Sequence, residues 1–561
     1  MNAVTINVAS HLAVLAATDP DRKAVIVPRG NSESSLTFGQ LHEESDALAN
    51  GLVAAGITAG SRIAVMVPPS LEFFTLTFAL FKVAAVPVMI DPGMGLRNVG
   101  TCLAEAEPAA FIGIAKAHLA RRIYGWAKGA ITVNVGRSRF FCKHSTQSLR
   151  KPGPFTPPTV TADTTAAILF TSGSTGLAKG VVYTHGIFSA QVEMLKTMYS
   201  IQPGEIDLCT FPLFALFGPA LGMTCVVPAM NPSRPATIDA ARTIATIEKY
   251  KITNLFGSPA VIRRLGDYGN YHNTKLPTLK RAISAGAPAS HDVIERFAKM
   301  LSPGVQLYTP YGATEALPVA NIGSDELLAT RKLTETGHGI CIGRPVSGVT
   351  VHITTIRDDA VPVFDAVSCM KTGEIGEFVV RGPIVTQSYF RREAATALAK
   401  MTDPATGETL HRMGDVGYYD ELGRLWFCGR KSQRVVTEQG TLFTDQVEPI
   451  FNVLANVHRT AVVGVKGMPV LCVELISASN QYDPDPSSEI PHVRVPIPAF
   501  VWRHVLPNLQ HRSSLFDTTR LITTFLLHTE PFPVDPRHNS KINREKLAVW
   551  AAKQLREQKP V

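Results

Sequence analysis

The sequence predicts an α/β fold in which mostly parallel sheets carry helices on their faces. Three observations support this: helical patterns alternate with short apolar runs, Gly and Pro separate them, and the chain is long enough for several cores. From Leu36, the segment LTFGQLHEESDALANGLVAAGITAGSRIAVMVPPS is typical of a turn, an amphipathic helix and a strand ending at Pro68. The same alternation recurs over residues 73–90, 166–170, 238–256 and 280–285.

The chain is expected to form more than one domain, because 561 residues exceed the roughly 300 that a single hydrophobic core serves. Between Cys341 and Trp426, short β-branched runs separated by Gly, Pro and Asp predict antiparallel strands in a small barrel-like subdomain. Strands near Val435 and over 461–465, with a helix near Val447, then predict a smaller α+β unit. We therefore expect a large N-terminal domain, residues 1–431, and a small C-terminal domain, residues 432–561.

Composition excludes several function classes. The formal charge of +9 is thin for this length, and Lys and Arg are scattered between apolar stretches without a dense block, which argues against a nucleic-acid partner. The eight cysteines lie far apart with no CxxC spacing, so we expect unpaired buried thiols and no zinc site.

No targeting or membrane segment is predicted. The first residues lack the basic start and small-residue cleavage site of a signal peptide, which favours a cytoplasmic location. The longest apolar stretch, residues 73–90, is broken by Lys82 and Pro87 and fits a buried helix followed by a strand.

A loop rich in Gly, Ser and Thr follows an apolar run in AAILFTSGSTGLAKGVVYTH. Its glycines allow backbone N–H groups to converge, its hydroxyls add donors, and its lysine adds positive charge, so it is suited to binding a polyphosphate. It is not a Walker loop, because Lys179 is followed by Gly and not by Ser or Thr. The alternative is an ordinary Ser/Gly-rich turn, which has no need of three hydroxyls, three glycines and a lysine together.

Four more motifs follow in order: SAGAP at 284–288, YGATE at 311–315, GD at 414–415 and SKINR around Lys541. With TSGSTGLAKG, they resemble the motifs of the adenylate-forming (ANL) superfamily, which includes acyl-CoA synthetases, firefly luciferase and the adenylation domains of peptide synthetases. The resemblance runs from about Leu36 to Leu547. It implies ATP and Mg²⁺ as cofactors, a mobile C-terminal domain, and activation of a carboxylic acid as an acyl adenylate.

The resemblance also implies the roles of individual residues. The phosphate loop would be formed by Thr171, Ser172, Gly173, Ser174, Thr175, Gly176 and Lys179. The adenine would be bound by Gly286, Ala287, Pro288, Gly312 and the stacking ring of Tyr311.

Five further residues complete the implied site. Thr314 would contact the α-phosphate and Glu315 would bind the metal, since Mg²⁺ prefers carboxylate and phosphate oxygens. Asp415 would accept the ribose hydroxyls, and Arg430 would lie near the ribose and phosphate. Lys541 would offset the charge that develops as a carboxylate attacks the α-phosphate.

The sequence departs from the superfamily pattern at three positions. Ala215 stands where relatives often place a His or an aromatic residue that gates the acyl pocket, and Ser540 stands where Gly usually precedes the lysine. Ser432 replaces the usual Asp or Lys of the hinge, which leaves backbone rotation possible without an ion pair.

The segments DPRHNSKINREKL, CIGRPVSGV and PLFALFGPALGMT resemble the OleC family of β-lactone synthetases in bacterial long-chain olefin biosynthesis. This resemblance implies that a 2-alkyl-3-hydroxy fatty acid is adenylated and that its own 3-hydroxyl then closes a β-lactone. It also implies association with a reductase and a β-lactone decarboxylase. Candidate bases for the hydroxyl are His338, His411 and His538, although a lone His is more often structural.

The apolar pocket that such a substrate needs has candidate wall residues, although core packing is the preferred explanation for most of them. These candidates are Phe211, Leu213, Phe214, Leu216, Phe217, Met223 and Met230. Two alternatives to the lactone reaction stay open: a long-chain acyl-CoA synthetase that shares the first half-reaction, and a non-catalytic nucleotide-binding scaffold. The charged residues Lys179, Glu315, Asp415 and Lys541 argue against the scaffold.

Overall fold

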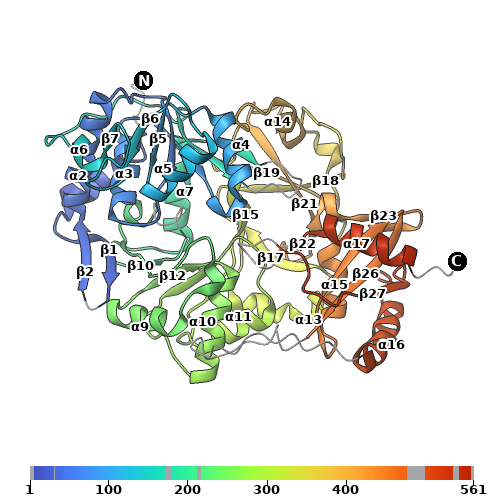
Figure 1. Ribbon diagram of the computed structural model, residues 1–561. Helices are drawn as coiled ribbons and strands as arrows, with labels where there is room; N and C mark the ends of the chain where they lie inside the picture. Colours follow the sequence, from blue (N-terminus) through green and yellow to red (C-terminus); the bar gives the residue numbers. More distant parts are fainter. Residues whose placement is uncertain are drawn as a thin grey trace.

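The computed structural model describes residues 6–30, 32–171, 178–211, 217–476, 499–534 and 542–557. Its architecture is α/β, as predicted, with two seven-stranded sheets, an eight-stranded antiparallel sheet and a small three-stranded sheet near the C-terminus (Figure 1).

The first seven-stranded sheet is parallel except for one edge hairpin. Its order is β14-β13-β12-β10-β11-β1-β2, and only the β1–β2 pair is antiparallel. The strands are β1 (Lys23–Arg29), β2 (Ser32–Thr37), β10 (Ile206–Cys209), β11 (Thr224–Val226), β12 (Asn254–Gly257), β13 (Arg281–Ser284) and β14 (Leu307–Tyr308).

The second sheet repeats this plan in the order β7-β6-β5-β3-β4-β8-β9, with β8–β9 as its antiparallel pair. The strands are β3 (Arg62–Met66), β4 (Val86–Ile90), β5 (Ala110–Gly113), β6 (Ile131–Asn134), β7 (His144–Ser145), β8 (Thr165–Thr171) and β9 (Lys179–Thr184). The strand predicted before the phosphate loop is therefore confirmed as β8.

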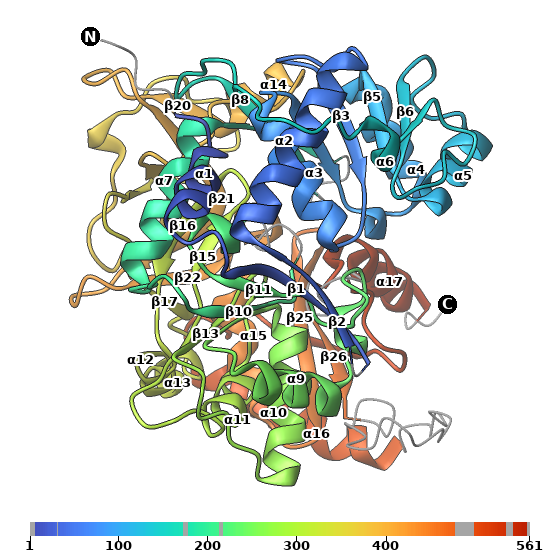
Figure 2. The same ribbon diagram turned by 90° about the vertical axis from the view of Figure 1, so that its left-hand side faces the viewer.

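Helices fill the space between the two sheets and cover their outer faces. α2 (Phe38–Ala54), α3 (Leu71–Lys82) and α7 (His185–Met198) share one apolar core with residues of both sheets. Figure 2 shows α2 and α3 side by side. α3 is buried from Phe73 onward because its sequence, LEFFTLTFALFK, is apolar nearly all round.

Other helices pack outside the sheets. α9 (Ala240–Tyr250), α10 (Pro259–His272) and α11 (His291–Ala298) cover the first sheet. Around the second sheet and the N-terminus lie α1 (Ser10–Thr18), α4 (Leu96–Ala106), α5 (Ala115–Tyr124) and α6 (Thr146–Leu149).

The predicted antiparallel region is also confirmed. Its order is β15-β16-β17-β22-β21-β19-β18, with β20 paired to β21. The elements are β15 (Tyr311–Ala313), β16 (Ala316–Asn321), α12 (Ser324–Ala329), α13 (Arg331–Thr334), β17 (Ile340–Pro345), β18 (Thr350–Thr354), β19 (Gly376–Arg381), α14 (Glu393–Ala399), β20 (Lys400–Thr402), β21 (Thr409–Tyr419) and β22 (Leu425–Arg430).

The C-terminal elements form an α+β unit with cores of their own. They are β23 (Val435–Thr437), β24 (Gly440–Leu442), α15 (Thr444–Asn452), β25 (Val457–Val465), β26 (Met468–Leu475), α16 (Ala499–Leu515), β27 (Thr524–Leu527) and α17 (Arg544–Glu557). The predicted boundary after residue 431 falls inside η4 (Lys431–Gln433), and it stays a prediction.

All eight cysteines lie among the described residues, and all eight are free thiols, as predicted. Seven of them are buried. Within the described part of the chain, no helix is both long and apolar enough to traverse a bilayer.

Candidate active site

The predicted nucleotide-binding segments meet beyond the carboxyl ends of neighbouring parallel strands, where α/β sheets usually bind ligands. Residues 285–288 directly follow β13, and Tyr311 lies three residues beyond β14, which pairs with β13. Gly286 has φ +101° and is exposed, so this turn requires glycine and leaves its backbone accessible to a planar ligand. Tyr311, Thr314 and Glu315 are each only half-buried.

Tyr311, Asp415 and Arg430 form one polar cluster. The Tyr311 hydroxyl donates to Asp415 Oδ2 over 2.5 Å, and Arg430 Nη1 lies 3.1 Å from Asp415 Oδ1. β21 and β22 impose this pairing, because Asp415 and Arg430 lie opposite each other in their register. The Asp415 carboxylate raises the pKa of Arg430, and burial, reinforced by Asp415, raises that of Tyr311 well above its usual value. The cluster presents a buried carboxylate beside an aromatic ring, as ribose and adenine binding requires.

Glu315 is held at both its backbone and its side chain. Its carbonyl accepts hydrogen bonds of 3.0 Å from both the backbone N–H and the hydroxyl of Thr386, and its Oε1 accepts one of 2.6 Å from Tyr389. The neighbouring Thr314 carbonyl accepts 2.6 Å from the Tyr183 hydroxyl. Sequence reasoning missed Thr386, Tyr389 and Tyr183, which lie far from the YGATE motif along the chain.

Lys400 lies behind Glu315 and was also missed. It is buried, and its Nζ donates to the Thr386 hydroxyl over 3.1 Å. Burial lowers the pKa of Lys400 to about 7, while the negative charge of Glu315 opposes that change. A lysine in the apolar run ALAKM was the only signal that the sequence offered.

The phosphate loop closes the β8–β9 hairpin, in which Thr171 pairs with Lys179. Ser172, Gly173, Ser174, Thr175 and Gly176 lie outside the described residues. Lys179 Nζ lies 4.9 Å from the ring centroid of Tyr389, whose hydroxyl bonds to Glu315. The loop's lysine and the expected metal ligand are thus joined through one aromatic side chain.

Lys541 also lies outside the described residues, so its convergence with the phosphate loop stays a prediction. The segment that follows it is anchored in the C-terminal unit: Arg544 Nη2 bonds to Glu448 Oε2 over 2.8 Å, and Arg544 Nε reaches Gln433 Oε1 over 3.2 Å. Gln433 belongs to η4, at the predicted domain boundary.

The donor set fits a magnesium nucleotide. Glu315 offers a hard carboxylate on a half-exposed residue, with Thr314 beside it, and Mg²⁺ is usually bound by one or two carboxylates together with substrate phosphates. Asp207, Cys209 and Cys225 also lie close enough together to hold a metal ion, and all three are buried in the first sheet. Burial raises the pKa of all three side chains, that of Asp207 to about 6, so the thiols are protonated and are poor metal ligands.

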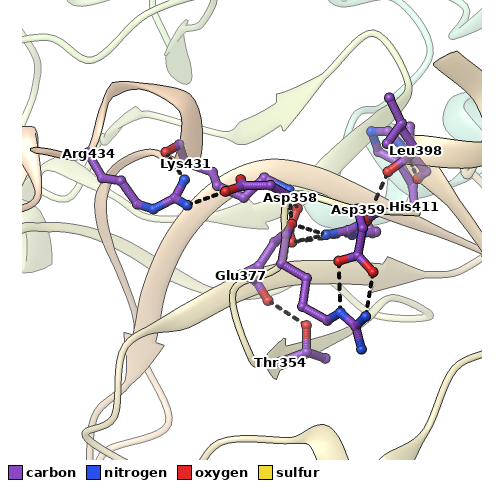
Figure 3. Close-up of polar contacts among 11 residues, drawn as sticks. Thr354, Asp358, Asp359, Glu377, Leu398, His411, Lys431 and Arg434 are labelled. Atoms are coloured by element: carbon purple, nitrogen blue, oxygen red, sulfur yellow. Dashed lines mark hydrogen bonds and ion pairs between the residues drawn. The ribbon is translucent and has the colours of Figure 1, made fainter. Parts of the chain in front are cut away.

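Ser432 lies between two residues that pair with the large antiparallel sheet region. Lys431 Nζ lies 2.9 Å from Glu377 Oε1, and Arg434 Nη2 lies 2.6 Å from Asp358 Oδ2 (Figure 3). Glu377 is almost fully buried and also pairs with Arg412 over 2.6 Å. The segment 431–434 at the predicted domain boundary is therefore held by ion pairs of Lys431 and Arg434, although Ser432 supplies none.

The candidate bases are dispersed. His411 is buried next to Lys400 on the β20–β21 pair, and its Nδ1 lies 3.1 Å from the Ala399 carbonyl. Burial, with help from Lys400, holds the pKa of His411 well below its usual value. His338 is exposed and contacts the Leu333 carbonyl, while His538 lies outside the described residues. The base stays unassigned.

Four of the candidate pocket residues are described, and the structure divides them. Phe211, Phe217 and Met223 pack in one cluster against Phe256, whereas Met230 packs in the core on the other face of the first sheet. Two cavities of about 20 Å³ each share Phe217 as a lining residue. Leu213, Phe214, Ala215 and Leu216 lie outside the described residues.

Comparison with known proteins identifies the family. Residues 12–390 match the family described as AMP-binding enzyme. The chain is 45% identical over 566 residues to the olefin β-lactone synthetase of Xanthomonas campestris pv. campestris, with 98% of each chain covered. It is also 45% identical over 568 residues to the olefin β-lactone synthetase of Stenotrophomonas maltophilia, again with 98% of each covered.

Solved structures agree on the fold. The amide bond synthetase McbA of Marinactinospora thermotolerans matches with a TM-score of 0.74 at 21% identity, covering 97% of this chain and 99% of that one. ATP-bound MatB of Rhodopseudomonas palustris matches with a TM-score of 0.74 at 19% identity, covering 98% and 100%. The resemblance predicted from the motifs is confirmed: this chain is an AMP-forming ligase that belongs to the AMP-binding enzyme family and, within it, to the olefin β-lactone synthetases.

Proposed function

We propose that this enzyme activates a 2-alkyl-3-hydroxy fatty acid with ATP, releases pyrophosphate, and closes the acyl adenylate to a β-lactone with release of AMP. The observation that carries the proposal is the cluster of Tyr311, Asp415 and Arg430 beside the anchored Glu315. The 45% identity to two olefin β-lactone synthetases over nearly the whole chain supports the lactone product.

In the first step, a carboxylate oxygen of the substrate attacks the α-phosphorus, and the bond to the bridging oxygen breaks so that pyrophosphate leaves. Tyr311 would stack on the adenine and Asp415 would accept the ribose hydroxyls, which together fix the nucleotide for this attack. Glu315 would hold Mg²⁺, which supplies charge neutralisation at the phosphates. Lys179 and Lys541 would offset the negative charge that develops around the α-phosphate.

In the second step, the substrate's 3-hydroxyl oxygen attacks the acyl carbon, and the bond from that carbon to the phosphate oxygen breaks to release AMP. The hydroxyl proton passes to a base that is not assigned. The nucleophile belongs to the substrate itself, so its effective concentration is high and no second acceptor has to bind. The mixed anhydride supplies the free energy that closes the strained four-membered ring.

The reaction uses ATP, and we place it in the cytoplasm. We also infer that the product passes to a decarboxylase that converts the lactone, and that a reductase supplies the hydroxy acid.

The test is one incubation of the enzyme with ATP, Mg²⁺ and a 2-alkyl-3-hydroxy acid, with and without coenzyme A, followed by mass spectrometry. The proposal expects AMP and β-lactone in both samples. Formation of acyl-CoA, with AMP only when coenzyme A is present, would identify an acyl-CoA synthetase instead. Absence of AMP in both samples would support a non-catalytic nucleotide-binding protein.

A further inference from the structure

The excess positive charge of the chain is concentrated in one segment. Residues 115–143 contain seven Lys and Arg and no Asp or Glu, against a net charge of +9 for the whole chain. Six of the seven are exposed: Lys116, Arg122, Lys128, Arg137, Arg139 and Lys143. None of these six forms an ion pair with another described residue. The expectation that Lys and Arg are scattered without a dense block is therefore wrong for this segment.

The same segment exposes large apolar side chains. Leu119, Ile123 and Tyr124 point outward from α5, and Phe141 is 81% exposed in the loop between β6 and β7. Leu119 and Ile123 are one helical turn apart and lie on the same face as Lys116, so the outer face of α5 mixes basic and apolar side chains. Surface helices normally turn their aliphatic side chains toward the core.

The loop that exposes Phe141 has a strained backbone. Phe140 and Phe141 have φ of +42° and +59°, the left-handed region that a bulky residue rarely adopts. The Arg122 guanidinium lies 5.4 Å from the Phe141 ring centroid, which brings the helix and the loop into one patch. Nearby, Tyr124 and Trp126 stack with centroids 5.3 Å apart.

This patch lies at the periphery of the molecule. α5 follows β5, which pairs with β6, and Figure 2 shows α5 at the right-hand margin beside β6. None of the residues predicted to bind nucleotide belongs to it.

We propose that the surface formed by α5 and the 137–143 loop docks on a membrane surface rich in anionic lipid. Lysine and arginine would contact lipid phosphates while Leu119, Ile123 and Phe141 enter the acyl boundary, as in interfacial helices of this composition. Two features favour lipid over an acidic polymer. Aliphatic side chains offer nothing to nucleic-acid bases, which are bound by stacking on aromatic rings in grooves. The long-chain acid of the proposed function also partitions into membranes, and this second reason rests on that proposal.

The experiment is co-sedimentation of the full chain with vesicles of phosphatidylcholine alone and of phosphatidylcholine mixed with phosphatidylglycerol, at low and high salt. Binding is expected only to the anionic vesicles and should weaken with salt, because exposed charges are screened. Each Lys or Arg near such a surface is worth about fivefold in partitioning. Arg137→Gln/Arg139→Gln/Lys143→Gln should therefore lower binding on the order of 100-fold.

A second variant separates the contribution of apolar side-chain insertion from that of charge. Ile123→Ser/Phe141→Ser keeps every cation and should lower binding at high salt as well as at low salt. The matched control, Arg242→Gln/Lys249→Gln/Lys332→Gln, removes three exposed cations from α9 and α13 and should bind as the natural chain does. Pyrophosphate release with a short, water-soluble hydroxy acid should be unchanged in all three variants, which verifies folding.

Equal vesicle binding by all variants, or no vesicle binding by the natural chain, would overturn the proposal. Binding of a single-stranded RNA oligonucleotide without vesicle binding would overturn it in favour of nucleic acid. These outcomes are independent of the proposed reaction, because vesicle binding is measured without substrate, whereas failure of the reaction would show as missing lactone.

Discussion

The hydroxyl of Tyr389 donates a 2.6 Å hydrogen bond to Oε1 of Glu315. The two residues are 74 positions apart, and the bond links the segment after β19 to the loop that follows β15. Thr386, from the same segment, fixes the Glu315 carbonyl. The expected metal ligand is therefore oriented by an element that the YGATE motif does not contain.

Replacing Tyr389 with Phe should lower the rate of pyrophosphate release about tenfold, because a hydrogen bond to a charged group contributes roughly 1.5 kcal/mol or more. The loss should be accompanied by a higher Mg²⁺ requirement, which a titration of rate against Mg²⁺ would measure. Tyr419→Phe is the control, since that hydroxyl donates to the Val351 carbonyl in the antiparallel sheet. Identical Mg²⁺ curves for Tyr389→Phe and the natural enzyme would contradict the role given to Tyr389.

Lys541→Ala should keep the fold and nucleotide binding while lowering the adenylation rate about 10²–10³-fold. The lost ammonium would otherwise offset roughly 3–4 kcal/mol of developing charge. Lys546→Ala, which changes an exposed lysine five residues further on, should have no effect. Pyrophosphate release and ATP binding would be measured separately, and near-normal pyrophosphate release by Lys541→Ala would refute the assignment.

Motifs predicted the fold class, which the structure confirms, and the residues that we propose to contact the nucleotide, because both follow from local patterns. The positive φ of Gly286 is a local requirement that glycine meets. Apolar runs before and after a Gly-rich loop likewise indicate strands. Thr386, Tyr389 and Lys400 could not be predicted, because their roles depend on strand pairings that bring distant segments behind Glu315. For Lys400 the apolar run ALAKM was the only signal, and it does not say which residue the lysine contacts.

The surface charge shows a different kind of miss. The net charge indicated a small excess of basic residues, and the expectation that they are scattered overlooked the basic run at 115–143, which is visible in the sequence. The sequence could not show that α5 and the 137–143 loop form one surface. That follows from the pairing of β5 with β6 and from the position of Arg122 beside Phe141. Strand register and loop conformation depend on long-range contacts, so the sequence pattern could not predict this surface.

Glu377→Gln should destabilise the protein by about 3 to 5 kcal/mol, because Arg412 and Lys431 would be left without a counter-charge in a buried site. Figure 3 shows Glu377 at the centre of this network. Urea denaturation followed by fluorescence would measure the change. Asp359→Asn breaks an exposed pair with Arg357 and should leave the midpoint nearly unchanged. Equal midpoints for the two variants would show that the buried network contributes little.

His185 should make stability fall in mild acid. Burial lowers the pKa of His185 from 6.5 to about 4, so between these values the unfolded chain binds a proton that the folded chain does not. The stability from the neutral ring is fully present above pH 6.5 and is lost as pH falls toward 4, by about 3 kcal/mol at most.

The test replaces His185 with Asn. The ring's Nδ1 accepts from the Val8 backbone N–H over 3.3 Å, a bond that an Asn oxygen can replace. His185→Asn should therefore flatten the pH dependence of the unfolding free energy in this window, whereas His504→Asn on an exposed helix surface should not. Parallel pH profiles for His185→Asn and the natural protein would show that some other group controls acid sensitivity.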